Sequence, residues 1–170
     1  MAKKIAVTGP ESTGKTALAQ QMAKMFNATW VPEYAREYLI NINRPYTAED
    51  LDIIAENQIK TLEKAQNKET NLIIADTELL VIKIWYEHAF KKCPQWILEA
   101  LEKQKFDLYL LCYVDIPWSY DPLREHPHLR SYFYGQYKKE LKTRGWPFAV
   151  VAGNGSERIN NAADLIKKAL

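Results

Sequence analysis

The sequence predicts an α/β fold built on a parallel sheet, and two observations support this. Short apolar segments alternate with longer segments of helical periodicity along the whole chain. The first apolar segment, 5–7, runs directly into the glycine-rich stretch 9–16, which opens an amphipathic helix. Strands that alternate with helices pair in parallel, because each crossover helix returns the chain to the same edge of the sheet. We therefore expect a three-layer α/β/α sandwich with five parallel strands.

Five segments have the composition of strands. Leu72–Ala75 is apolar at every position, as expected for a strand that is covered on both faces. Thr29–Val31 is β-prone, and Pro32 marks its end. The expected strands are 5–7, 29–31, 72–75, 108–114 and 148–151.

Apolar spacing and cap residues predict the helices. Thr47 followed by two acids marks one helix start, and Pro94 suits the first position of another. Residues 115–130 carry three prolines and show no clear periodicity, so we expect a mobile loop or short-helix lid there. The expected helices are 15–26, 47–68, 79–90, 94–105, 132–144 and 156–170.

Length and composition limit the possible classes of protein. The 170 residues fit one domain over 1–170, with 47% hydrophobic and 26% charged residues, as in globular proteins. A net charge of +2 gives no reason to expect a nucleic-acid or membrane partner, and no apolar stretch has membrane-spanning length. Cys93 and Cys112 have no zinc-like spacing, so we expect a reducing, cytoplasmic location.

The stretch Gly9–Thr16 matches the pattern G-x-x-x-x-G-K-[ST] at every position. Gly9 and Gly14 allow backbone angles that turn successive N–H groups toward phosphate oxygens. The following helix adds the positive end of its dipole. Lys15 would neutralise the β- and γ-phosphates of ATP, and the Thr16 hydroxyl would ligate Mg²⁺. The residues expected to contact ATP are Gly9, Glu11, Ser12, Thr13, Gly14, Lys15, Thr16 and Arg130.

Two acids follow expected strands, at the edge where parallel sheets bind ligands. Asp76 would hold Mg²⁺, often through water, or contact the acceptor; alternatively it caps the next helix. Glu33 lies three residues before Arg36, so a carboxylate and a guanidinium are offered together. Such a carboxylate can take the proton of an attacking hydroxyl during phosphoryl transfer, although Glu33 could also be a solvated loop acid.

The lid segment contributes Arg124 and Arg130. Arginines on a closing loop can stabilise the charge of a transferring phosphoryl group, and the alternative is ordinary surface charge. His126 and His128 are separated by one residue and lack an evident third ligand, so no metal site is expected from them.

Four segments taken in order give a more specific indication. Gly9–Thr16, Glu33–Tyr38, Ala75–Glu78 and Asp121–Arg124 resemble the ribosylnicotinamide kinase domain of NadR-type bacterial NAD-salvage proteins. The resemblance covers nearly the whole chain, and the Glu-Tyr-x-Arg-Glu segment is its most discriminating part. The chain differs from that family at Pro32, where tryptophan can occur, and at Glu78.

The resemblance implies that ATP phosphorylates the 5′-hydroxyl of nicotinamide riboside. It assigns catalytic roles to Lys15, Glu33, Asp76 and Arg124, metal binding to Thr16 and Asp76, and substrate binding to Glu33, Tyr34, Arg36 and Asp76. A His-x-Gly-His signature is absent, so adenylyl transfer is not expected. Two alternatives stay open: a regulatory or partner-driving P-loop ATPase, and a kinase for another nucleoside.

Overall fold

Five strands form one parallel sheet in the order β2-β3-β1-β4-β5. The computed structural model describes all 170 residues. The strand bounds are β1 (Lys3–Thr8), β2 (Thr29–Val31), β3 (Leu72–Asp76), β4 (Leu108–Cys112) and β5 (Phe148–Val151). The predicted three-layer α/β/α architecture with five parallel strands is confirmed.

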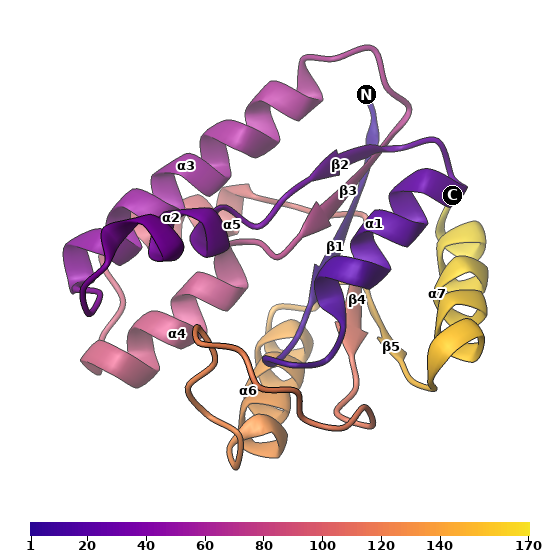
Figure 1. Cartoon of the computed structure of the whole chain (residues 1–170). Helices are drawn as coiled ribbons and strands as arrows, with labels where there is room; N and C mark the ends of the chain where they lie inside the picture. Colours follow the sequence, from indigo (N-terminus) through magenta and orange to yellow (C-terminus); the bar gives the residue numbers. More distant parts are fainter.

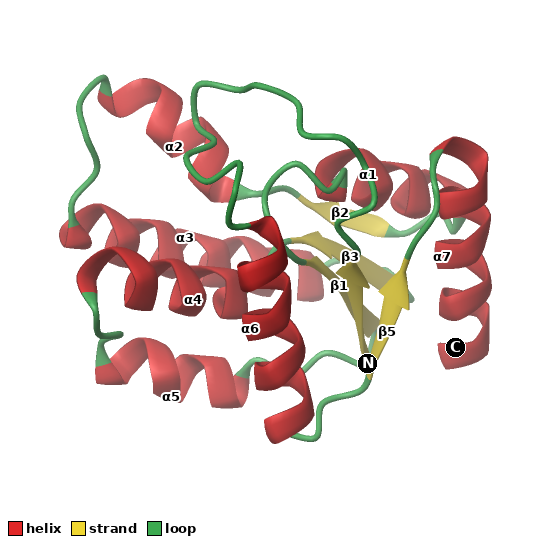
Figure 2. Ribbon diagram, turned by 90° about the horizontal axis from the view of Figure 1, so that it is seen from below, coloured by secondary structure: helices red, strands yellow, loops and turns green.

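Seven helices cover the two faces of this sheet. α1 and α7 lie against one face, and α3, α4, α5 and α6 lie on the other side (Figures 1 and 2). None of the helices is long and apolar enough to cross a membrane. The bounds are α1 (Lys15–Met25), α2 (Tyr34–Ile42), α3 (Ala48–Gln66), α4 (Leu79–Phe90), α5 (Gln95–Lys103), α6 (Arg130–Thr143) and α7 (Gly155–Ala169).

Side chains of each buried strand alternate between two hydrophobic cores. Along β3, Ile73 and Ala75 pack among residues of α3 to α6, whereas Leu72 and Ile74 pack against α1 and α7. Since the side-chain period of a strand is two, Asp76 faces the same side as Ile74. The strand therefore aims its terminal carboxylate toward the first turn of α1.

Several local features differ from the sequence-based expectations. Helix α2 was not predicted; Tyr34, Tyr38 and Leu39 lie at helical spacing on it and pack against the larger core. β4 ends at Cys112 instead of continuing to residue 114, and Pro94 is the N-cap of α5 instead of its first residue. The differences at β4 and α5 are boundary effects, because assigned helix and strand ends vary by one or two residues.

The start of α3 organises the loop that precedes it. Thr47 and Asp50 form a capping box, which confirms the predicted helix start. The Asp50 carboxylate is buried and also accepts hydrogen bonds from Arg44 Nη1 at 2.7 Å and from Tyr38 Oη at 2.7 Å. The Arg44 guanidinium and the Tyr38 hydroxyl are the main causes that hold the pKa of Asp50 well below its ordinary value. This network ties α2 to α3 and holds the loop containing Tyr46.

One helix carries a glycine that the fold does not need. Gly135 lies inside α6 without a positive φ, and a Cβ built there meets no atom within 4 Å. We expect Gly135→Ala to raise the free energy of unfolding by about 0.5–1 kcal/mol, because alanine loses less backbone freedom on folding. Urea denaturation would measure this. Gly145→Ala is the matched control, since Gly145 has φ +63° and the substitution should destabilise. Lower stability of Gly135→Ala would contradict the assigned helix.

Candidate active site

The loop between β1 and α1 is held in a conformation that requires glycine at two positions. Gly9 has φ +133° and Gly14 has φ +73°. A Cβ added at Gly9 would stand 3.0 Å from the Cys112 carbonyl oxygen, so the loop passes too close to β4 for any side chain. Gly14 also precedes α1 directly, which places the helix N-terminus at the loop. The loop thus has the geometry expected of a phosphate cradle.

The two residues after Gly14 turn toward different partners. Lys15 Nζ donates a hydrogen bond to the Pro10 carbonyl at 2.7 Å, so its side chain folds across the loop. Thr16 Oγ1 donates to Asp76 Oδ2 at 2.6 Å. The sheet order explains this contact: β3 lies beside β1, and Asp76 pairs in register with Val7 at the end of β1. Asp76 does not cap α4; Glu78 does, accepting from the Leu80 N–H.

The residues around Asp76 fit a bound Mg²⁺. Asp76 is fully buried, and its Oδ1 atom has no hydrogen-bond partner. A buried carboxylate oxygen without a partner costs folding free energy, so it is suited to a ligand that is charged or bound through water. Burial raises the pKa of Asp76, while the Thr16 hydroxyl, Lys15 and Arg36 act in the opposite direction. Oxygen donors of this kind are the ligands that Mg²⁺ prefers.

Glu33 follows β2 and forms the N-cap of α2, which places it at the same edge of the sheet as Asp76. Burial is the main cause that raises the pKa of Glu33; the nearby Asp76 carboxylate raises it further, and Lys15 and Arg36 lower it. Arg36 forms an ion pair with Asp121 of the segment after β4, at 2.5 Å. The acids predicted from two separate strands are therefore close enough to influence each other's charge.

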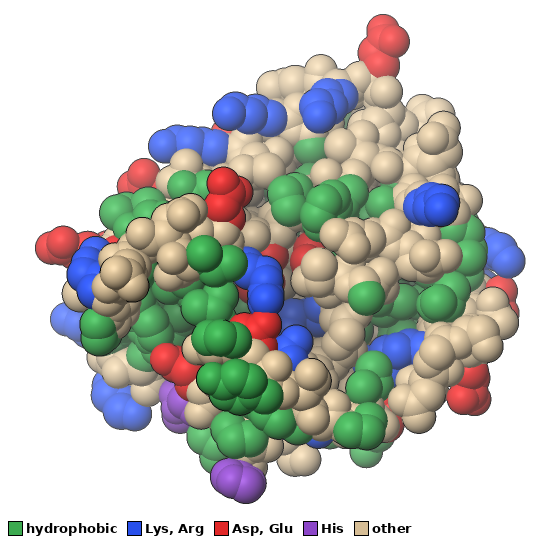
Figure 3. Space-filling view, viewed as in Figure 1, with side chains coloured by type: hydrophobic (Ala, Val, Ile, Leu, Met, Phe, Trp, Pro, Cys, Tyr) green, Lys and Arg blue, Asp and Glu red, His purple; other side chains and the backbone are tan.

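One cavity of about 330 Å³ joins most of the predicted site residues. Gly9, Glu11, Ser12, Lys15, Thr16, Glu33, Arg36 and Arg124 line it, and Asp76 lies buried behind Thr16. Figure 3 shows acidic and basic side chains together in a hollow of this face, bordered by hydrophobic side chains. The cavity lies at the carboxyl ends of the strands, where open α/β sheets bind ligands.

The segment 113–129 closes over the cradle. The Glu11 carboxylate accepts hydrogen bonds from the backbone N–H groups of Glu125 and His126, both at 3.2 Å. Ser12 Oγ accepts from the Ser119 N–H at 2.9 Å. Arg124 lines the cavity but donates to the Ser119 carbonyl at 2.5 Å. In this structure the expected lid is therefore joined to the phosphate loop by direct hydrogen bonds.

Besides Asp76 and Gly14, three predicted residues lie outside the cavity lining. Thr13 is buried, and its hydroxyl donates to the Pro10 carbonyl. Tyr34 donates its N–H to the Gln58 side chain and packs its ring against Tyr38, at a centroid distance of 6.1 Å. Arg130 donates to the backbone carbonyl of Ser12, on the loop itself.

The far end of the cavity is aromatic, and most of its residues were not predicted. Tyr46 packs edge-on against Trp85 at 4.9 Å and accepts a hydrogen bond from its indole N–H. His88, on α4, is half-buried and packs edge-on against Phe133. These residues come from four elements and share no sequence motif, although aromatic residues at helical spacing on α4 and α6 offered a weak signal. The aromatic end consists of Tyr46, Trp85, His88, His126, Phe133 and Tyr137.

The sheet order, the glycine-dependent loop and the Thr16–Asp76 pair define a P-loop protein. The chain belongs to the AAA domain family, whose model matches residues 4–158.

The comparisons with individual proteins confirm the resemblance to NadR. The chain is 26% identical over 126 residues to the trifunctional NAD biosynthesis/regulator protein NadR of Escherichia coli, covering 71% of this chain and 30% of that protein. The Salmonella typhimurium protein of the same name is 25% identical. The chain therefore spans less than a third of the length of these curated relatives.

Solved structures show the same fold. A NadR protein in complex with NAD and AMP-PNP superposes with a TM-score of 0.77 at 22% identity, over 99% of this chain and 49% of that one. A deoxyadenosine kinase from M. mycoides gives a TM-score of 0.64 at 15% identity, over 98% of this chain and all of that one. Thymidylate kinase from Ehrlichia chaffeensis gives 0.68 at 14% identity, with 99% of each chain covered.

The buried carboxylate behind the cradle generates a prediction about metal dependence. We expect Asp76→Asn to raise the Mg²⁺ concentration needed for half-maximal ATP turnover by about 10–100-fold, because asparagine keeps the shape but loses the charge. Titrating Mg²⁺ at saturating ATP measures this. Asp107→Asn is the control, since Asp107 pairs with Lys3 at the opposite end of the sheet. An unchanged Mg²⁺ requirement would show that Asp76 does not serve the metal.

Proposed function

We propose that this chain transfers the γ-phosphate of ATP to the 5′-hydroxyl of nicotinamide riboside and produces nicotinamide mononucleotide. In this proposal residues 1–170 act as one kinase domain, with 115–130 as its lid. The observation that carries it is the cavity, which joins a phosphate cradle, a buried acid and an aromatic end. NadR relatives named for NAD biosynthesis, and a solved NadR in complex with NR, support this acceptor.

The phosphate end has the groups that phosphoryl transfer needs. Lys15 would leave the Pro10 carbonyl for the β- and γ-phosphates, and Thr16 with Asp76 would hold Mg²⁺. When bound, the metal neutralises charge on the phosphate oxygens. Arg124 and Arg130 now bond to backbone carbonyls, so both can exchange those contacts for phosphate oxygens when ATP is present.

Glu33 is the proposed base. It lines the cavity between the cradle and the aromatic end, and burial raises its pKa. A carboxylate with a raised pKa accepts a proton more readily, which suits removal of the hydroxyl proton as the phosphoryl group moves. Arg36, held by Asp121, would keep Glu33 ionised and orient the ribose.

With Lys15 and Arg124 assigned to the phosphates of ATP, the other charged side chains that line the cavity favour an acceptor with a cationic ring. Arg36 and Arg44 both line the cavity, but they are already paired, Arg36 with Asp121 and Arg44 with Asp50. Three carboxylates also line it, those of Glu11, Glu33 and Glu125. The nicotinamide ring of the riboside carries a positive charge, and aromatic faces attract such cations.

The same pairing argues against a nucleoside monophosphate as acceptor. An acceptor phosphate needs arginines that are free to turn toward it, but both Nη atoms of Arg44 donate to Asp50 and one Nη atom of Arg36 donates to Asp121, so acids restrain both guanidinium groups. The thymidylate kinase match therefore supports the fold alone. A kinase for another nucleoside is the second candidate, favoured by the deoxyadenosine kinase match. A regulatory P-loop ATPase is the third.

An acceptor panel tests the proposal. Purified protein with Mg-ATP should phosphorylate nicotinamide riboside, and uncharged nucleosides should react at least about tenfold more slowly. A tenfold ratio of these rates corresponds to about 1.4 kcal/mol of attraction between the cationic ring and the aromatic and carboxylate side chains. Product formation is followed by chromatography.

Glu125→Gln serves as the specificity variant in that panel. Its carboxylate accepts a hydrogen bond from Tyr46 Oη at 3.1 Å at the aromatic end. Removing the charge should therefore reduce the ratio of the rate with the cationic riboside to the rate with uncharged nucleosides. If only another nucleoside reacts, the assigned acceptor is wrong. ATP hydrolysis without any phosphorylated acceptor would favour the ATPase alternative.

Glu33→Gln tests the base. We expect turnover to fall by about 10²–10⁴ at unchanged ATP affinity, because glutamine cannot accept the proton. A protonated Glu33 is inactive, so wild-type kcat/KM should fall as pH drops through a pKa above that of an ordinary glutamate, and this acidic limb should disappear in the variant. Glu37→Gln, on the exposed side of the same helix, is the control. Near-normal turnover of Glu33→Gln would overturn the role.

A further inference from the structure

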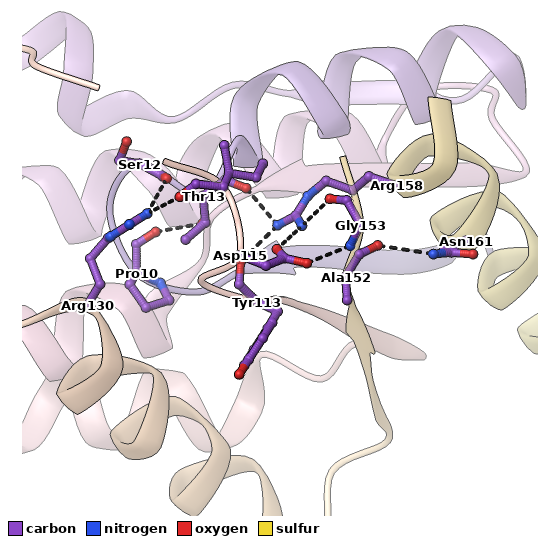
Figure 4. A network of polar contacts seen from close by, with 11 residues as sticks. Pro10, Ser12, Thr13, Tyr113, Asp115, Arg130, Ala152, Gly153, Arg158 and Asn161 are labelled. Carbon is purple, nitrogen blue, oxygen red and sulfur yellow. Dashed lines mark hydrogen bonds and ion pairs between the residues drawn. The ribbon is translucent and has the colours of Figure 1, made fainter. Parts of the chain in front are cut away.

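A buried arginine on α7 lies behind the phosphate loop, outside the cavity. The Arg158 side chain is 5% exposed and comes from the first turns of α7 (Figure 4). Its Nη2 atom donates to the Thr13 carbonyl at 2.9 Å and to the Tyr113 carbonyl at 3.1 Å. Its Nη1 atom donates to Asp115 Oδ1 at 2.8 Å and to the Gly153 carbonyl at 3.1 Å. One side chain thus joins the loops that follow β1, β4 and β5.

The contact with Thr13 bears on the cradle through peptide geometry. In a planar trans peptide, the C=O of one residue and the N–H of the next point in opposite directions. The Thr13 carbonyl and the Gly14 N–H belong to the same peptide unit. A donor that holds the carbonyl outward therefore holds the Gly14 N–H inward, toward the position of a phosphate.

Arg130 holds the neighbouring peptide in the same way. Its Nη1 atom donates to the Ser12 carbonyl at 3.0 Å and to the Ile116 carbonyl at 2.7 Å. The Ser12 carbonyl shares a peptide unit with the Thr13 N–H. Ser12 itself has φ +54°, an unfavourable angle for a residue with a side chain, so this part of the loop needs outside support. Figure 4 shows the two arginines on either side of the loop.

Asp115 fixes the Arg158 guanidinium. Its second oxygen accepts from the Gly153 N–H at 2.6 Å, so both carboxylate oxygens are bound. Desolvation acts to raise the pKa of Asp115, but the Gly153 N–H and the Arg158 guanidinium outweigh it and lower that pKa. A buried cation costs folding free energy unless it is paired. The pairing with Asp115 allows Arg158 to stay buried behind the loop whether or not nucleotide is present.

We propose that Arg158, anchored by Asp115, is a positioning residue that keeps the Thr13–Gly14 peptide turned for phosphate binding. Arg130 differs from it, because its guanidinium donates only to backbone carbonyls and carries no carboxylate partner in the structure. Arg158 is thus the permanent support and Arg130 the exchangeable one. The inference rests on ATP being the ligand of the proposed function, but not on the identity of the acceptor.

Calorimetric titration of Mg-ATP against purified variants tests this. Arg158→Met should weaken ATP binding by about tenfold to a hundredfold, the range for losing a charged hydrogen bond. Arg158→Lys, which can still donate to one carbonyl, should recover part of the affinity. Asp115→Asn should weaken binding less, because it frees the guanidinium without removing it, and it serves as the second variant if Arg158→Met does not fold.

Arg144→Met is the matched control. Arg144 is also largely buried and forms ion pairs with Glu102 and Glu140. It is the C-cap of α6, which packs on the larger core, on the other side of the sheet from α7. A purely structural role predicts that both arginine variants lower Tm and leave the Kd for ATP unchanged at a temperature where they are folded. A Kd for ATP within twofold of wild type in Arg158→Met would overturn the proposal. If Arg158→Met does not fold, the same result in Asp115→Asn would overturn it. Failure of the wild-type protein to bind ATP would also overturn it. ATP binding without phosphorylation of nicotinamide riboside would refute only the proposed acceptor.

Discussion

The parallel pairing of β1 with β3 places the phosphate loop beside the buried carboxylate of Asp76. The register sets Asp76 against Val7, one residue before β1 ends, and the alternation of β3 turns this carboxylate toward α1. Thr16, in the first turn of α1, can then donate to it at 2.6 Å. A shift of one residue in this register would turn Asp76 into the opposite core, among α3 to α6, where no phosphate loop exists. The remaining site residues are arranged around this pair.

The two hydrophobic cores support different parts of the cavity. The smaller core, beneath α1 and α7, supports the phosphate loop from behind, and Arg158 extends that support into the loop's own backbone. The larger core, beneath α3 to α6, ends in the aromatic side chains that line the aromatic end of the cavity. Under the proposed function, a change in acceptor preference would arise from residues of α4, α6 and the 43–47 loop without disturbing the phosphate loop. This separation is consistent with the low identity between this chain and other proteins of the same fold.

The charged side chains around the cavity differ in how fully they are paired. Two of the three arginines that line the cavity are paired with an aspartate, Arg36 with Asp121 and Arg44 with Asp50, whereas Arg124 donates to the Ser119 carbonyl. The acids at the sheet edge, Glu33 and Asp76, lack such full pairing, and burial raises both pKa values. A buried carboxylate oxygen without a partner, such as Asp76 Oδ1, is costly in a folded protein, and acids with raised pKa values at one edge are typical of a site that binds a cation or a proton.

The sequence by itself determined the elements whose signal is local. The sequence predicted the apolar run at 72–75, the loop 9–16 and the helix start at Thr47, because strand burial, glycine conformations and cap bonds each involve residues close in the chain. The acids Glu33 and Asp76 were found because they follow strands. Only the tertiary structure decided that His88 and Phe133 meet at the aromatic end of the cavity, that α2 forms, and that Arg158 reaches Thr13. These contacts join residues from separate elements, and their distances depend on how the helices pack on the sheet, which no local pattern encodes.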